Sequence, residues 1–126
     1  LIVPQSHPLA DRDSIDLEDT IPYPQIIFSK SSGLRPVVDS LFKKIGKQPV
    51  IAYEVEEDQV IAGLVSKGFG IAICPDMPIL GSLDVKVIQI KSPVWERNFY
   101  LATMKDRYLP PIVQEFKKFI TENAEL

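Results

Sequence analysis

Apolar residues occur along this chain in two patterns: short, largely unbroken runs and stripes that recur at helical spacing. The runs at residues 1–3, 25–29, 50–55 and 70–74 predict strands, because they are rich in β-branched residues and several are stopped by proline. The clearest stripe follows the second run and predicts a helix that begins near Gly33, with Pro36 in its first turn and Gly46 after its end. Its apolar positions are Leu34, Val37, Val38, Leu41, Phe42 and Ile45.

Weaker patterns predict the remaining elements. Residues 58–67 form a second helix with Asp58 as a suitable cap, and residues 14–20 form a short helix or turn with Ile15 and Leu17 turned inward. Residues 84–90 and 99–104 are expected to be strands, the first nearer a sheet edge. A final helix opens at Pro110-Pro111, and its inward face is Ile112, Val113, Phe116, Phe119 and Ile120.

The order strand, helix, strand, helix, strand predicts an α/β fold built from right-handed crossover units. The run at 70–74 is apolar on both faces, which indicates a parallel sheet covered by helices.

Composition narrows the class of protein. With 45% apolar and 25% charged residues among 126, the chain has the make-up of a soluble globular domain. The net charge is −3, so the chain lacks the excess of Lys and Arg that is typical of a DNA-binding domain. No apolar run approaches the ~20 residues of a membrane helix. A single cysteine, Cys74, excludes an internal disulfide and fits a reducing compartment. We expect a cytoplasmic location, no membrane partner and a chain that is a fragment.

Three segments together resemble LysR-type transcriptional regulators. The stretch His7-Pro8-Leu9-Ala10, followed by the acidic residues 15–19, is similar to the segment where that family crosses between regulatory subdomains. Residues 65–75 (VSKGFGIAICP) are similar to the family's V-x-x-G-x-G-I-A-x-x-P signature. The closing segment from Arg97 and the terminal amphipathic helix also fit, so the resemblance covers nearly the whole chain.

The resemblance implies a type 2 periplasmic-binding-protein-like α/β fold, with two subdomains and an effector cleft between them. Residues 1–4 would be a crossover strand from the first subdomain, and residues 5–96 the second regulatory subdomain. Residues 97–126 would be the return strand and C-terminal helix of the first subdomain. The missing part would leave apolar surface on Val3, Phe99, Leu101 and the last helix.

Two loops are the candidate effector site. The first lies between a strand and the predicted helix 34–45, where amide N–H groups and hydroxyls can hold a ligand. The alternative is that Ser31 and Ser32 only cap their own helix. The second follows strand 50–55, and its acidic residues would repel an anion unless they point away or the effector is cationic, zwitterionic or neutral. The candidate residues are Ser29, Lys30, Ser31, Ser32, Gly33, Val55, Glu56 and Glu57.

Other reactive residues have plainer interpretations. His7 lacks a nucleophile or orienting partner and is expected to be structural, and Cys74 is expected to be a buried, inert thiol. Gly68 and Gly70 precede a strand, so a dinucleotide loop is excluded. For Trp95 we expect packing rather than a place beside the cleft. We therefore predict no catalytic residue, no metal site and no cofactor.

The resemblance also implies partners. Family dimers pair head to tail through the first helix and adjacent strand of the second subdomain, so the interface candidates are Leu34, Val38, Leu41 and Phe42. The expected function is sensing of a small-molecule effector by a homodimeric or homotetrameric regulator, with DNA bound only through an N-terminal domain absent here. Two alternatives stay open: a transporter's solute-binding protein with the same fold, and an enzyme on a similar frame.

Overall fold

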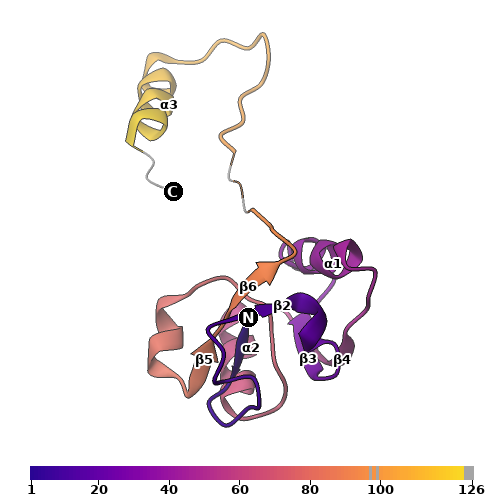
Figure 1. Cartoon of the computed structure of the whole chain (residues 1–126). Coiled ribbons are helices and arrows are strands. Elements are labelled where there is room, and N and C mark those ends of the chain that lie inside the picture. Colours follow the sequence, from indigo (N-terminus) through magenta and orange to yellow (C-terminus); the bar gives the residue numbers. More distant parts are fainter. Residues whose placement is uncertain (97, 99, 124–126) are drawn as a thin grey trace. The chain divides into compact units, whose positions relative to one another are not determined.

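The computed structural model describes residues 1–96, 98 and 100–123. They form two compact units, Leu1–Trp95 and Glu96–Leu126 (Figure 1). The first unit holds six strands, two 3₁₀ turns and helices α1 and α2, and the second holds helix α3. The predicted α/β class is confirmed.

Strand pairing in the first unit is mixed, which corrects the prediction of a parallel sheet. β3 (Pro24–Phe28) pairs in parallel with β4 (Val50–Val55), and β2 (Ser14–Asp16) with β6 (Gln89–Ser92). β1 (Ile2–Pro4) pairs antiparallel with β5 (Val85–Val87). The two antiparallel strands come from the first and last parts of the unit, a pairing that local periodicity does not encode.

Residues 70–74 are not a regular strand, contrary to prediction, yet they occupy the expected central place. One parallel bridge joins Ile71 to Gln25 on β3, and one antiparallel bridge joins Ala72 to Ile2 on β1. The side chains of Ile71, Ala72 and Ile73 are buried. The segment therefore links β3–β4 to β1–β5, although each neighbour pairs with it at a single residue.

Gly70 is needed where this segment passes β3. Its φ is +157°, and a Cβ atom there would lie 2.8 Å from the carbonyl oxygen of Pro24. Only a residue without a side chain permits this approach, so the glycine serves backbone packing.

The two central helices follow the sequence pattern closely. α1 spans Arg35–Lys44 with a proline in its first turn, Lys43 and Lys44 in its last turn, and Gly46 at φ +65° beyond it. α2 spans Asp58–Ser66 and ends before Gly68, at φ +79°. One detail was wrong: Glu57 rather than Asp58 occupies the cap position, and the Asp58 carboxylate only accepts a hydrogen bond from the amide of Gln59.

Three other segments differ from expectation. Residues 14–20 form strand β2 followed by a 3₁₀ turn at Leu17–Thr20, with Ile15 and Leu17 buried as predicted. Residues 84–90 divide into β5 and β6 because the chain changes partner at Ile88, whose amide donates to Leu1. Residues 100–104 form no strand, and Phe99 lies outside the described residues.

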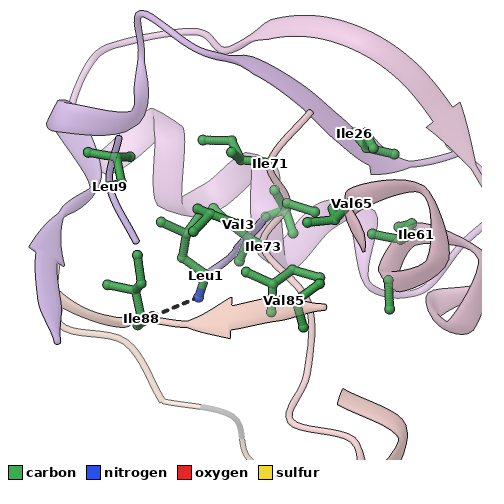
Figure 2. Packing of buried hydrophobic residues seen from close by; sticks show 14 of the residues in the cluster. Leu1, Val3, Leu9, Ile26, Ile61, Val65, Ile71, Ile73, Val85 and Ile88 are labelled. Carbon is green, nitrogen blue, oxygen red and sulfur yellow. Dashed lines mark hydrogen bonds between the residues drawn. The ribbon is translucent and has the colours of Figure 1, made fainter. Parts of the chain in front are cut away.

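The core of the first unit joins residues from both ends of the unit. Figure 2 shows Leu1 and Val3 packed among Ile71, Ile73, Val85 and Ile88, with the Leu1 nitrogen 3.0 Å from the carbonyl oxygen of Ile88. Val3 is fully buried, so the prediction of exposed apolar surface there was wrong. β1 pairs with Ala72 on one side and with β5 on the other, which satisfies its backbone, while the side chains of Ile2 and Val3 lie in the core cluster.

The second unit carries helix α3, Pro111–Asn123, as predicted. Its expected inward face is largely exposed, with exposed fractions of 79% for Ile112, 60% for Phe116 and 63% for Phe119. Leu101 is also half exposed, as predicted. No residue of α3 among those described is buried, so its apolar stripe has no partner within this unit.

Candidate functional site

Three chain segments end at one edge of the sheet in the first unit. β3 runs parallel to β4, and its bridge to Ile71 is also parallel, so the carboxyl ends of all three point the same way. Residues 29–33, 55–58 and 74–76 follow these ends. Ligands of open α/β sheets bind at such an edge, because the connecting loops can vary while the strands hold them in place.

The first loop is fastened to the end of β4. The amide of Ser29 donates to the carbonyl oxygen of Val55 at 2.8 Å, which continues the β3–β4 ladder by one residue. The amide of Ser32 then donates to the carbonyl of Ser29 at 3.0 Å and closes a tight turn. This backbone geometry places the candidate residues Ser29 and Val55 side by side.

Side chains join the two loops directly. The hydroxyl of Ser31 donates to Glu56 Oε1 at 3.3 Å, and the hydroxyls of Ser29 and Ser31 lie 2.8 Å apart. The structure therefore brings Ser29, Ser31 and Glu56 together, as the convergence of strand ends predicts. Lys30 and Glu57 lie in the same two loops and are exposed.

The two serines have different roles. Ser32 Oγ accepts from the amide of Leu34 at 3.3 Å, a local turn bond just before α1; the cap position itself is Leu34 and has no side-chain cap hydrogen bond, so the capping interpretation was wrong in detail. Ser31 makes no such contact, and its hydroxyl points to Glu56 instead. The Ser32 hydroxyl thus serves the turn before α1, whereas those of Ser29 and Ser31 contact each other.

Several backbone donors of the first loop are unused. Within the described part of the chain, the amides of Lys30, Ser31 and Gly33 donate to no protein acceptor. These groups lie just before α1, where the helix also contributes a partial positive charge. The loop therefore offers donors from its backbone beside acceptors from Ser29 and Glu56.

Arg35 holds the two strand ends and α1 together. Its Nη1 donates to the Phe28 carbonyl at 2.8 Å and lies 3.5 Å from Glu54, while its Nε donates to Asp39 at 2.8 Å. The hydrogen bond that Arg35 donates to the Asp39 carboxylate raises the pKa of Arg35 above its ordinary value. Sequence reasoning missed this residue, because an arginine in the first turn of a helix is commonly solvated.

Most of the residues proposed for a dimer interface are buried in the core. Val38, Leu41 and Phe42 are buried inside the unit, and only Leu34 among the four is partly exposed. The face that α1 and β4 present to solvent instead carries Ile51, with an exposed fraction of 45%, and a groove of about 550 Å³ beside it. Arg35, Asp39 and Lys43 also line this groove.

The sequence analysis did not include a third loop at the same edge among the site candidates. Cys74, Pro75 and Asp76 line a cavity of about 610 Å³ together with Trp95. Trp95 is 38% exposed, so it borders a cavity rather than lying fully packed. The end of the apolar run 70–74 at Pro75 could have indicated this loop, because that run ends at the same edge as β3 and β4.

The remaining reactive groups are structural. Burial raises the pKa of the Cys74 thiol to about 11, and the carboxylates of Asp58 and Asp76 act in the same direction, so the thiol is protonated at neutral pH. His7 Nδ1 accepts from the amide of Leu9 at 3.2 Å, its ring packs against Tyr23, and burial lowers its pKa. Among the described residues, no cluster of His, Cys, Asp and Glu is arranged to hold a metal ion. No helix in the described ranges is both long and apolar enough to span a bilayer.

Comparison with protein families gives a match over almost the whole chain. The model described as the LysR substrate binding domain matches residues 1–125. The HTH-type transcriptional regulator YybE of Bacillus subtilis (strain 168) is 38% identical over 120 residues, covering 95% of this chain. The chain spans 41% of the length of that relative.

Solved structures agree with this match. The effector binding domain of QuiR in complex with shikimate is 48% identical, with a TM-score of 0.85, covering 94% of this chain and 56% of that one. The BenM effector binding domain with its effector benzoate is 26% identical, with a TM-score of 0.60, covering 73% of this chain and 44% of that one. Both similar proteins are named as binding small carboxylic acids.

Proposed function

Since the chain belongs to the LysR substrate binding domain family, a non-enzymatic family of effector-binding modules in transcriptional regulators, we propose that it senses a small organic acid. The acid binds at the carboxyl edge of the sheet in the first unit, between the loops after β3 and β4. This proposal sets aside the transporter and enzyme alternatives, because the similar curated protein YybE is an HTH-type transcriptional regulator.

The observation that carries the proposal is the set of unused backbone donors. The amides of Lys30, Ser31 and Gly33 are free of protein acceptors within the described ranges, and the Lys30 side chain is exposed beside them. A carboxylate needs such donors, since each of its oxygens accepts more than one hydrogen bond. These donors also answer the objection that Glu56 would repel an anionic effector. The carboxylate of the ligand can bind at the amides, while Glu56 contacts other groups of the ligand.

The ligand would act on the whole regulator by favouring one arrangement of subunits. A ligand shifts such an equilibrium only through different affinities for the two arrangements. We propose that the intact protein is a homodimer or homotetramer, that α1 and β4 of the second regulatory subdomain contribute to its interface, and that DNA is bound outside this chain. The position of β4 supports this, because β4 pairs with β3 along one edge only among the described strands, and the exposed side chains of Val50, Ile51 and Tyr53 make it a suitable docking surface.

A thermal-unfolding titration of the intact protein tests the binding proposal. Shikimate is expected to raise the unfolding midpoint in a concentration-dependent manner, since a ligand that binds only the folded state stabilises it. Lys30→Met should weaken the binding of shikimate about fivefold, the equivalent of ~1 kcal/mol for exposed charges about 4 Å apart.

Lys67→Met is the matched control. Lys67 is an exposed lysine beyond the end of α2, so its removal changes the net charge equally but lies in the connection to the amino end of residues 70–74. Its binding should match that of the unmodified protein. Equal losses in the two variants, or no shift of the midpoint with shikimate or any other small organic acid, would contradict the proposal.

A further inference from the structure

The hydrogen bonds among Ser29, Ser31 and Glu56 have a fixed direction. A serine hydroxyl carries one hydrogen, and Ser31 uses it toward the Glu56 carboxylate at 3.3 Å. The 2.8 Å contact between the hydroxyls of Ser29 and Ser31 must then use the hydrogen of Ser29. The three side chains form a relay from Ser29 through Ser31 to Glu56.

Within these three side chains, this direction leaves only acceptors unused. The hydrogens of both serines are spent inside the relay, while Glu56 Oε2 and the lone pairs of Ser29 remain free to accept. Glu56 also forms no salt bridge with any residue that the structure describes. A group that fills this position must donate hydrogen bonds, and a carboxylate there would meet like charge and no donor.

We propose that Glu56 is a specificity-determining residue that makes the site require a hydroxyl group on the effector. This inference rests on the proposed function, since it concerns the same two loops. The carboxylate of the ligand takes the amides before α1, and a hydroxyl on the far side of the ligand donates to Glu56. Ser29 and Ser31 position the carboxylate of Glu56 and compensate part of its charge.

The inference separates two acids of known chemistry. Shikimate carries ring hydroxyls as well as a carboxylate, whereas benzoate carries only the carboxylate. A site built to bond a hydroxyl rejects an analogue that lacks one, because its own polar groups are then desolvated without a partner. The protein should therefore bind shikimate at least tenfold more tightly than benzoate.

Isothermal titration of the intact protein with both acids provides the test, using Glu56→Gln and, as a control outside the two loops, Asp84→Asn. Both substitutions remove one negative charge from an exposed side chain, but Asp84 lies just before β5 and its side chain makes no salt bridge to any described residue. Glu56→Gln should weaken shikimate binding about 10- to 100-fold, the range of a hydrogen bond to a charged group. Benzoate binding should stay unchanged or tighten, and Asp84→Asn should change neither affinity by more than about threefold.

The outcomes distinguish the inference from the proposal beneath it. If shikimate binds but Glu56→Gln weakens it no more than Asp84→Asn does, the specificity role is refuted while the site stands. Equal affinities of the unmodified protein for shikimate and benzoate would also refute it. If neither acid binds at all, the proposed function fails together with the inference. Unfolding midpoints of the two variants check that both are folded, which the exposure of Glu56 and Asp84 leads us to expect.

Discussion

Removing the guanidinium of Arg35 tests how the two strand ends are held in place. Arg35→Met keeps the length and much of the apolar stem of the side chain but deletes its bonds to Phe28, Asp39 and Glu54. The arginine side chain is only 11% exposed, whereas Asp39 and Glu54 are 56% and 42% exposed. The substitution therefore removes one shielded contact to the backbone together with two contacts to solvated carboxylates.

The magnitude follows from these exposures. Each ion pair with a solvated carboxylate is worth about 0.3–0.5 kcal/mol. The bond from a charged donor to the partly buried Phe28 carbonyl is worth about 1.5–3 kcal/mol, because its loss leaves the carbonyl without a partner. Arg35→Met should lower the free energy of unfolding by about 2–4 kcal/mol, and Arg35→Lys should recover only part of this, because lysine lacks the planar fork.

Urea denaturation of the intact protein measures this change, with Arg12→Met as the control. Arg12 bonds Asp19 at 3.0 Å, but the two side chains are 51% and 50% exposed, so its loss should cost less than about 0.5 kcal/mol. A free energy of unfolding for Arg35→Met that lies within ~0.5 kcal/mol of the Arg12→Met value would refute the role assigned to Arg35.

Three further predictions follow from packing, burial and exposure. Gly70→Ala should lower the free energy of unfolding by about 1–3 kcal/mol, whereas Gly63→Ala, with nothing within 4 Å of its Cβ position inside α2, should raise it by up to ~1 kcal/mol; thermal unfolding would show an error if the two behaved alike. The Cys74 thiol should react slowly with a disulfide reagent at pH 8 and faster as the pH approaches its pKa of about 11, so a rate that levels off near pH 9 would argue against its burial. Ile51→Lys should weaken self-association of the intact protein in sedimentation velocity, while Val60→Lys on α2 should not; identical sedimentation of the two would count against a β4 interface.

Local patterns were enough to predict the helices and the general place of the site. The stripe from Leu34 to Ile45 and Gly46 after it encode α1 through spacing and a left-handed stop, which depend only on neighbours in sequence. The convergence of Ser31 and Glu56 was also predictable, because parallel strands bring the loops after their carboxyl ends to one edge.

Contacts between distant residues were decided only by the tertiary structure. The run at 70–74 has the composition of a strand, but its neighbours pair with it at one residue each; residues 100–104 have a similar composition and form no strand. The division of 84–90 depends on β1 and β2, which lie more than 70 residues away in sequence. Composition measures the tendency to be buried, whereas a strand exists only where another backbone supplies hydrogen bonds.

The chemistry of the site shows the same division. The sequence by itself determined which residue types stand at the strand ends, and hence that hydroxyls, amides and carboxylates would meet there. Only the folded chain decided that Ser32 turns to its own helix, that Ser31 turns to Glu56, and that Arg35 ties both strand ends to α1. The reason is that residue type limits what a side chain can donate or accept, while the direction of each bond depends on partners that folding brings within about 3 Å.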